Sequence, residues 1–368
     1  MESFLWVFLF LSFFSWICGW PVAARFRFVP KPVDEADSEA SISIVIPARD
    51  EESNLRNLLP SLTTSEDLIH EIIVVSDQST DDTEAVARDA GAIVVAGEPL
   101  PEGWMGKSWA VQQGINTATG DWILALDADT MMEPGGFDKI RRFTADPESV
   151  HSICPYHRVV KPYEQLSAFF NVIMLLAMNA FTIKGPRVRD IGLFGQVLLI
   201  SRAQLDAVGG YESVKGEILE NFSLSRVLAR AGYHCRCYLG RGTISMRMFP
   251  DGLGGLVASW SKGFVSGADN TPKSALIGIS FWLSGLIMIV ISLTFLWLAP
   301  LPMIWAIGGL YWLGVAQCSY LFRHAGSYNF LTAVFFPITL IFYLAVFFAA
   351  VRRKRQGGQV QWKGRNVG

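Results

Sequence analysis

The sequence predicts an α/β fold with a mostly parallel sheet, joined to segments that span a membrane. Between residues 41 and 250, short apolar runs alternate with stretches that have apolar residues at helical spacing, as strands and helices do in parallel sheets. Outside that region lie apolar runs long enough to cross a bilayer. The composition agrees, because 51% of the residues are apolar, only 17% are charged and the mean hydropathy is +0.32.

The composition also excludes some functions. Lys and Arg together number 31 and Asp and Glu number 33, so the chain lacks the basic excess of proteins whose main partner is nucleic acid. The five cysteines have neither the spacing of a zinc site nor that of a disulfide framework. We therefore assign the cysteines no chemistry.

The amino terminus is expected to anchor the chain in the cell membrane. Residues 4–20 form an apolar run, and Arg25, Arg27 and Lys31 follow it. A cleaved secretory signal would carry its positive charge before the run. Because positive residues favour the cytosolic side, the amino terminus is expected outside and the following domain in the cytosol.

Shifts in composition divide the chain into an anchor, a linker, an α/β domain, an interfacial segment, transmembrane segments and a basic tail. We expect these at residues 1–24, 25–40, 41–250, 251–272, 273–351 and 352–368. In the α/β domain, strands are expected at 41–46, 71–75, 92–96, 121–126, 151–160, 196–201, 233–238 and 243–249, and helices at 107–117 and 218–231.

Residues 166–183 form an apolar run that approaches spanning length. A crossing there would put the segments on either side in opposite compartments. We therefore expect this run to lie in the membrane interface or to be buried in the fold.

The last third of the chain poses a problem of topology. Runs long enough to span a bilayer occur at 276–298, 303–322 and 330–351. Three crossings from a cytosolic domain would leave the basic tail outside, although its arginines favour the inside. Either one run is re-entrant or the last lies partly in the interface.

Two carboxylates, Asp127 and Asp129, follow the apolar run of residues 122–126. On an extended backbone, residues two apart project to the same side. Such carboxylates hold Mg²⁺ or Mn²⁺ together with substrate phosphates. Asp-x-Asp alone is common, so its neighbours must decide whether it is a site.

Further polar residues occupy equivalent places. Residues 47–52 follow the first strand, Asp77 follows the second, and Lys107 begins a helix before the fourth. Ligands of open α/β sheets bind at these strand ends and helix starts. Singly, each residue is more often a cap or a solvated turn. Because they occur together and in this order, we favour a ligand-binding site over caps and turns.

The motifs IPARDEESNL, VVSDQSTDDT, GWMGKSWA and LDADT, with the later Glu220-Asn221, resemble the successive motifs of the family 2 glycosyltransferases, which have the GT-A fold. The resemblance covers residues 41–249. More narrowly, PEGWMGKSWA, CPYHRV and VQWKGR resemble bacterial 4,4'-diaponeurosporenoate glycosyltransferases of C30 carotenoid synthesis. Hopene-associated glycosyltransferases share the GW-x-GK-x-WA pattern and come second.

The resemblance implies a UDP-sugar donor, most directly UDP-glucose, a lipid acceptor, and Mg²⁺ or Mn²⁺. It places Pro47, Glu51 and Asp77 around the uridine. It also places Lys107 and Asp127 near the ribose and phosphates.

The same resemblance puts Asp129 on the metal, with Asp127 as a second ligand, and Glu220 at the usual catalytic base. For the acceptor it points to Trp260 with Lys262 beside it, on a helical apolar stripe that fits a membrane-surface helix and a core-facing helix equally well. Trp260 lacks the Gln and Arg that precede this Trp in processive synthases, which weakens a polymerase interpretation.

Two departures from the family bear on the chemistry. Asp50 stands where the family commonly has Asn, and Asn221 stands where the family has an Asp after Glu220. An amide cannot accept a proton at neutral pH. A carboxylic acid acceptor, with a pKa of about 4 to 5 by analogy with Glu, is already ionised and needs positioning more than deprotonation.

We therefore expect transfer to the carboxylate of a C30 carotenoid acid. The alternatives are transfer to a hopanoid or a polyprenyl phosphate, and a non-catalytic membrane protein with a vestigial nucleotide fold. Asp127, Asp129 and Glu220 together argue against the vestigial alternative, because a vestigial site need not retain them.

Overall fold

The computed structural model describes residues 2–30, 40–63, 65–185, 188, 191–217, 219–356, 360–362 and 365–367. Most of the expected linker and part of the expected basic tail lie outside the described residues. The chain forms two compact units. Unit 1 comprises Met1–Phe26, Val159–Val188 and Phe249–Gly368, and unit 2 comprises Arg27–Arg158 and Arg189–Met248.

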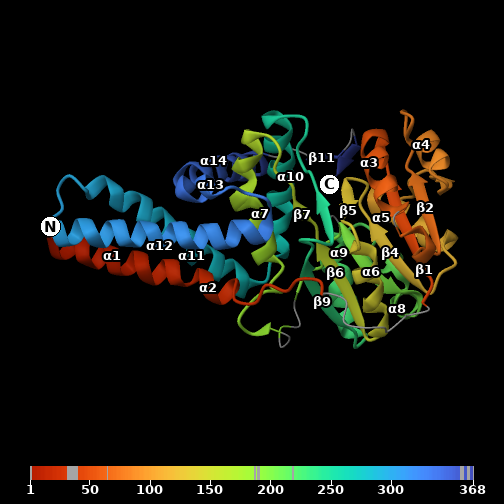
Figure 1. Ribbon diagram of the computed structural model, residues 1–368, viewed down its shortest axis with the longest axis horizontal. Coiled ribbons are helices and arrows are strands. Elements are labelled where there is room, and N and C mark those ends of the chain that lie inside the picture. Colours follow the sequence, from red (N-terminus) through yellow and green to blue (C-terminus); the bar gives the residue numbers. More distant parts are fainter. Residues whose placement is uncertain are drawn as a thin grey trace. The chain divides into compact units, whose positions relative to one another are not determined.

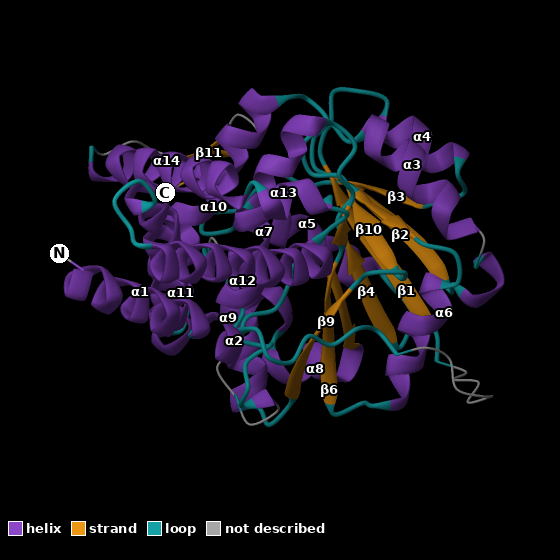
Figure 2. Ribbon diagram, turned by 60° about the vertical axis from the view of Figure 1, so that its left-hand side comes forward, coloured by secondary structure: helices purple, strands orange, loops and turns teal. Residues whose placement is uncertain are grey.

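Unit 2 is built on a seven-stranded sheet in the order β3-β2-β1-β4-β8-β6-β9. The strands are β1 (Ile42–Ala48), β2 (Glu71–Ser76), β3 (Ile93–Ala96), β4 (Trp122–Leu126), β6 (Ser149–Cys154), β8 (Val197–Ser201) and β9 (His234–Leu239). Strands β1 to β4 are parallel, as expected, and Figure 2 shows β1, β2 and β4 side by side. Strand β8 runs antiparallel between β4 and β6, so the sheet is mixed.

Helices cover both faces of this sheet. They are α3 (Glu52–Thr63), α4 (Thr83–Asp89), α5 (Gly106–Thr117), α6 (Gly136–Arg141), α8 (Arg202–Val208) and α9 (Glu220–Arg230). The leucines of α3 share a buried cluster with Ile44 and Ile46, on one face of β1. On the other face, Gly114 of α5 lies so close to Val45 that a Cβ would collide with its side chain. Glycine at this position lets α5 approach the strand.

A second, three-stranded sheet lies in the same unit, in the order β5 (Thr130–Met132), β10 (Ile244–Met246) and β7 (Tyr156–His157). The strand expected at 151–160 is therefore two strands, β6 and β7, which belong to different sheets. Pro155 separates them and removes a backbone N–H from the ladder. This small sheet fixes the segment that follows Asp129.

The secondary structure described for unit 1 is helical except for a short strand pair, β11 (Val360–Trp362) and β12 (Arg365–Val367). Its helices are α1 (Glu2–Ile17), α2 (Gly19–Val22), α7 (Ala168–Ala177), α10 (Leu253–Asn270), α11 (Lys273–Ser292), α12 (Leu301–Ala325), α13 (Phe330–Val334) and α14 (Phe336–Arg355). Among the described residues, four stretches are long and apolar enough to span a membrane: Glu2–Val22, Lys273–Phe295, Leu301–Ala325 and Phe336–Arg353. Figure 1 shows α1, α11 and α12 running side by side.

The apolar run at 166–183 forms a shorter helix than its length allows. Helix α7 has ten residues, which give about 15 Å of helix and cannot cross a bilayer. Eight of these residues are buried, and α7 packs against α10, α11, α12 and α14. The structure thus favours burial within unit 1 over the interfacial alternative.

Candidate active site

The candidate residues flank the point where the strand order of the large sheet reverses. The chain builds β1, β2 and β3 in one direction and then places β4 on the other side of β1. Open α/β sheets bind ligands beyond the carboxyl ends of the strands at such a reversal. Glu51 follows β1 here, and Asp127 and Asp129 follow β4.

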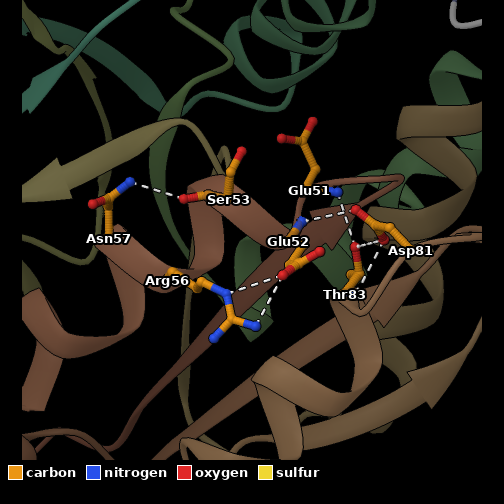
Figure 3. A network of polar contacts seen from close by, with 7 residues as sticks. All are labelled: Glu51, Glu52, Ser53, Arg56, Asn57, Asp81 and Thr83. Carbon is orange, nitrogen blue, oxygen red and sulfur yellow. Dashed lines mark hydrogen bonds and ion pairs between the residues drawn. The ribbon is translucent and has the colours of Figure 1, made fainter.

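The loop after β1 is fastened to the loop after β2. The backbone N–H of Glu51 donates to Thr83 Oγ1 at 2.9 Å, and that of Glu52 donates to the Asp81 carboxylate at 3.1 Å (Figure 3). Asp81 also accepts from the backbone and hydroxyl of Thr83. In Figure 3 the Glu51 carboxylate points away from this network. The contacts therefore fix the backbone of Glu51, while its carboxylate accepts a hydrogen bond from the Asn54 amide at 2.5 Å.

Asp50 takes part in the same fastening. Its φ is 51°, a left-handed conformation that Asp and Asn tolerate better than most residues. Its carboxylate accepts from the backbone N–H of Thr80 at 2.7 Å, which lowers the pKa of Asp50. An Asn would keep both the conformation and the acceptor. The departure from the family is thus compatible with a structural role in the loop.

Asp77 lies at the end of β2, beside the first strand. Its side chain is buried and pairs with Arg49, with 3.5 Å between Oδ2 and Nη1. Its backbone N–H donates to the carbonyl of Ala48 at 2.7 Å, which continues the pairing of β1 and β2. Pro47 of β1 is half-buried next to this contact. These residues form one edge of the candidate site.

Asp127 and Asp129 lie in a tight turn after β4. The backbone N–H of Thr130 donates to the carbonyl of Asp127 at 3.1 Å, so the chain is already turning between the two carboxylates. The expectation of an extended backbone was therefore wrong. The two carboxylates are nonetheless close enough to interact. Burial, then Asp127 and then Glu51 raise the pKa of Asp129 to about 7. One oxygen of Asp129, Oδ1, is buried without a hydrogen-bond partner.

Lys107 contacts one of these two carboxylates, that of Asp127. It is the second residue of α5, and its Nζ lies 2.6 Å from Asp127 Oδ1 and donates to the carbonyl of Gly195 at 3.2 Å. Burial lowers the pKa of Lys107, but Asp127 and Glu220 raise it more, so the net pKa lies above its ordinary value. The ammonium therefore stays charged beside the carboxylates.

Glu220 and Asn221 begin helix α9. The Asn221 amide donates to Glu220 Oε1 at 2.8 Å. Burial raises the pKa of Glu220, and Lys107 opposes that shift. A Cβ at Gly195 would collide with the Asn221 amide, so glycine at 195 allows the amide to reach its position. Asn221 therefore holds the carboxylate that the family pattern marks as a base.

The residues present fit a hard divalent cation. Asp129 offers a buried carboxylate oxygen with no hydrogen-bond donor, next to a second carboxylate on Asp127. Within the described part of the chain, no group of three His, Cys, Asp or Glu side chains converges as a metal site. One or two carboxylates can hold such a cation when the diphosphate of a substrate supplies further ligands.

Comparison with known proteins identifies the family. The model of "Glycosyl transferase family 2" matches residues 43–184, and that of "Glycosyl transferase family group 2" matches residues 122–350. The chain is 30% identical over 329 residues to a protein named 4,4'-diaponeurosporenoate glycosyltransferase from Staphylococcus aureus strain USA300, with 88% of each chain covered. The protein of that name from strain MRSA252 is similar to the same extent.

The chain belongs to the family 2 glycosyltransferases. It is an enzyme that transfers glycosyl groups. Its fold is similar to that of the mannosyltransferase PcManGT from Pyrobaculum calidifontis, which was solved in complex with GDP-Man and Mn²⁺. The TM-score is 0.54 at 15% identity, and 94% of this chain and 98% of that chain are covered. The glycosyltransferase therefore has the GT-A fold that the motifs predict.

One residue near the site carries no sequence signal. Tyr211, in the 3-10 segment Gly210–Val214, is buried, and its backbone N–H donates to Gln112 Oε1 at 2.9 Å. Burial, followed by Glu220 and Asp127, raises the pKa of Tyr211. Its hydroxyl therefore stays protonated in the corner that contains both carboxylates. No motif or spacing marks Tyr211, because the segment reaches the site only through the fold.

The two acceptor candidates lie in unit 1. Trp260, in α10, is buried and stacks on Phe170 of α7 with 5.0 Å between ring centroids. It also contacts Phe249 at 5.8 Å. Lys262 follows two residues later in the same helix, and its side chain lies outside the described residues. The apolar stripe of α10 therefore faces the protein at Trp260.

Proposed function

We propose that this glycosyltransferase moves glucose from UDP-glucose to the carboxylate of a C30 carotenoid acid in a single inverting displacement. The carboxylate oxygen attacks the anomeric carbon of glucose, the bond from that carbon to the diphosphate breaks, and the electron pair leaves with UDP. The products are a glycosyl ester and UDP. The choice of acceptor rests on one observation: the chain is 30% identical, over 88% of its length, to a protein named 4,4'-diaponeurosporenoate glycosyltransferase.

The donor half of the site would use residues at the strand ends. Pro47, Glu51 and Asp77 would surround the uridine, where carboxylates can accept hydrogen bonds from the base and the ribose. Lys107 would neutralise phosphate charge as a fixed cation, since its ammonium is held by Asp127 and the carbonyl of Gly195. A donor panel tests this step: UDP-glucose should be consumed much faster than GDP-mannose. Preference for GDP-mannose would overturn the uridine assignment.

Asp129, with Asp127 beside it, would hold Mg²⁺ or Mn²⁺. When bound, such a cation acts as a Lewis acid that offsets the charge developing on the leaving diphosphate. The protein's own contribution is a buried carboxylate oxygen without a hydrogen-bond donor and a lysine ammonium 2.6 Å from the second carboxylate.

The acceptor half favours a substrate that is already ionised. Asn221 cannot take a proton, and it occupies one oxygen of Glu220 by donating to it. A hydroxyl acceptor must lose a proton during attack, whereas a carotenoid carboxylate has lost it at neutral pH. Glu220 and Asn221 would therefore position the acceptor, and little general-base catalysis would be needed.

The variant Glu220→Gln separates the two chemistries, because Gln keeps the size of the side chain and removes its basicity. The variant should lose only a few-fold of its rate with a carotenoid acid and about 10² or more with a hydroxyl acceptor such as a hopanoid alcohol. Equal collapse of both rates would contradict the proposal that the acceptor brings its own charge. Equal Kd values for UDP in variant and parent would confirm that the donor half is intact.

The enzyme would work at the cell membrane with its catalytic unit in the cytosol. Arg25 and Arg27 follow the first membrane helix and favour the cytosolic side. Nucleotide sugars would reach unit 2 there, while unit 1 would present the lipid. Trp260 and Lys262, in α10, are the residues that we assign to the acceptor, as the family resemblance implies.

A further inference from the structure

Helices α1, α11 and α12 of unit 1 run along one common direction (Figure 1). Helices α1 and α11 are antiparallel, because Gly19 lies against Trp282, whereas Trp16 lies against Gly285. The contact between the rings of Phe8 and Phe295, at 6.2 Å between centroids, extends this register to the far end. Helix α11 therefore crosses the same layer as α1, in the opposite direction.

Helix α12 returns across that layer. The indole N–H of Trp282 donates to Gln317 Oε1 at 2.7 Å. At the end of α12, His324 stacks on Phe26 at 4.8 Å, and Ser327 accepts from the backbone N–H of Val159 at 2.8 Å. Phe26 and Val159 are the residues at which the chain passes between unit 1 and unit 2. The carboxyl end of α12 thus lies at the end of unit 1 that leads to the catalytic unit.

The next segment turns back into the layer without crossing it. The hydroxyl of Tyr311 donates to the carbonyl of Val334, and the ring of Phe336 lies 5.4 Å from that of Tyr311. A Cβ at Gly314 would also meet Phe336 at 3.5 Å. At 1.5 Å per residue, these contacts lie about 16 to 21 Å before the end of α12. The break between α13 and α14, at Phe335, is therefore well inside a layer of about 30 Å.

Helix α14 then runs in the same direction as α12. Its Tyr343 contacts Phe169 of α7 at 6.5 Å between centroids, and Phe169 contacts Phe322 of α12 at 5.3 Å. Phe336 of α14 thus lies beside Gly314 of α12, and Tyr343 lies near Phe322. Residue numbers therefore rise in the same direction along both helices. Both helices therefore lead to the end of unit 1 that connects to the catalytic unit.

We propose that α13 and α14 form a re-entrant hairpin that enters and leaves the membrane on the catalytic side. Arg352, Arg353 and Arg355 are exposed at the end of α14. They would form a basic collar that contacts the anionic lipid headgroups of that leaflet, where each basic residue is attracted by the negative surface potential. The full crossings are then α1, α11 and α12, and the conflict between helix count and the positive-inside rule disappears.

Cysteine accessibility tests the topology without reference to activity. Gln356→Cys reports on the tail, Asp89→Cys, exposed on α4, reports on the catalytic side, and Trp297→Cys, 93% exposed between α11 and α12, reports on the opposite side. A membrane-impermeant maleimide should label Gln356→Cys under the same conditions of permeabilisation as Asp89→Cys. Each signal is compared with that of the parent chain, which contains five natural cysteines.

Labelling of Gln356→Cys together with Trp297→Cys would show that α14 crosses the membrane and would overturn the proposal. A C-terminal fusion after Gly368 gives a second measurement that needs no substitution. A green fluorescent protein there should fluoresce, whereas alkaline phosphatase there should be inactive. The opposite pair of results would contradict the hairpin.

The basic collar has its own test. In nanodiscs, replacing phosphatidylcholine by phosphatidylglycerol should raise the Tm of the parent, and the triple Gln variant of Arg352, Arg353 and Arg355 should lose most of that rise. A matched control replaces three exposed arginines of unit 2 by Gln: Arg56, Arg88 and Arg230. An equal loss in both triple variants, or no loss in either, would rule out the headgroup contact.

Discussion

The ammonium of Lys107 lies 2.6 Å from the carboxylate of Asp127. The same ammonium donates to the carbonyl of Gly195, and the carboxylates of Glu220 and Asp129 also raise its pKa. The lysine therefore interacts with three segments: the turn after β4, the residue Gly195 shortly before β8, and the start of α9. This contact organises the corner in which we place the diphosphate of the donor.

The first prediction concerns this lysine. Lys107→Met keeps the length of the side chain but removes the charge that balances the neighbouring carboxylates. We expect kcat/KM for the nucleotide sugar to fall about 100-fold or more, as for the loss of a preorganised electrostatic group. The control is Lys215→Met, because Lys215 pairs with Glu212 on the exposed surface. Nearly equal kcat/KM values for the two variants would contradict the role of Lys107.

The second prediction concerns the metal. Asp129→Asn removes the charge of the buried carboxylate, so titration calorimetry should show at least about tenfold weaker UDP binding in the presence of Mn²⁺. Without Mn²⁺ the variant and the parent should bind UDP equally weakly. Asp89→Asn, an exposed change on α4, should leave both titrations unchanged. If Mn²⁺ strengthened UDP binding to Asp129→Asn as much as to the parent, another residue would hold the cation.

The third prediction concerns acid stability. His151 stacks on the ring of Phe143 at 4.2 Å between centroids, and the ring of Tyr238 lies 4.6 Å from Phe143 and 5.9 Å from His151. The pKa of His151 is lowered to about 4, chiefly by burial, with Asp146 opposing the shift and Arg236 adding to it. Because the unfolded chain binds a proton near pH 6.5 and the folded chain does not, stability is complete above pH 6.5 and falls as the pH drops toward 4. The loss is about 3 kcal/mol at most, at 1.36 kcal/mol per pKa unit.

The variant His151→Phe should remove this pH dependence, since phenylalanine stacks in the same place and does not titrate. Thermal unfolding of the detergent-purified chain between pH 4 and 7 provides the measurement. The difference in Tm between the parent and the variant should change with pH and reach its limit above pH 6.5. A constant difference across that range would contradict the assignment.

The fourth prediction concerns the packing of α1 on α11. A side chain at Gly285 would collide with the backbone of Trp16, whereas a Cβ at Gly308 would meet nothing within 4 Å. Gly285→Leu should therefore destabilise unit 1 by about 1 to 3 kcal/mol through overpacking. Gly308→Leu should change the Tm little. Equal Tm values for the two variants would show that α1 and α11 do not pack as described.

Much of the fold could be predicted from local patterns. The buried strands β1, β2 and β4 are runs of isoleucine, valine and leucine, and the leucines of α3 lie on one helical face. The antiparallel direction of β8 could not be predicted, because a strand buried on both faces has the same apolar sequence in either direction. The break at Phe335 was also missed, because hydropathy measures length and ignores the contacts of Tyr311 and Phe336.

The candidate site shows the same division. Motif positions predicted Lys107, Asp127, Asp129 and Glu220, and the fold brings the three carboxylates close enough to Lys107 to raise its pKa. Tyr211 was missed because its place depends on the packing of the segment before α9, which no local pattern encodes.

One measurement tests the proposed reaction most directly. The full-length chain in nanodiscs is supplied with UDP-glucose, Mn²⁺ and three acceptors together: a C30 carotenoid acid, a hopanoid alcohol and a polyprenyl phosphate. Mass spectrometry of the lipids should show a hexose added to the carotenoid acid, in a product that mild alkali cleaves as an ester. An unchanged carotenoid acid beside a glycosylated hopanoid or polyprenyl phosphate would contradict the proposal.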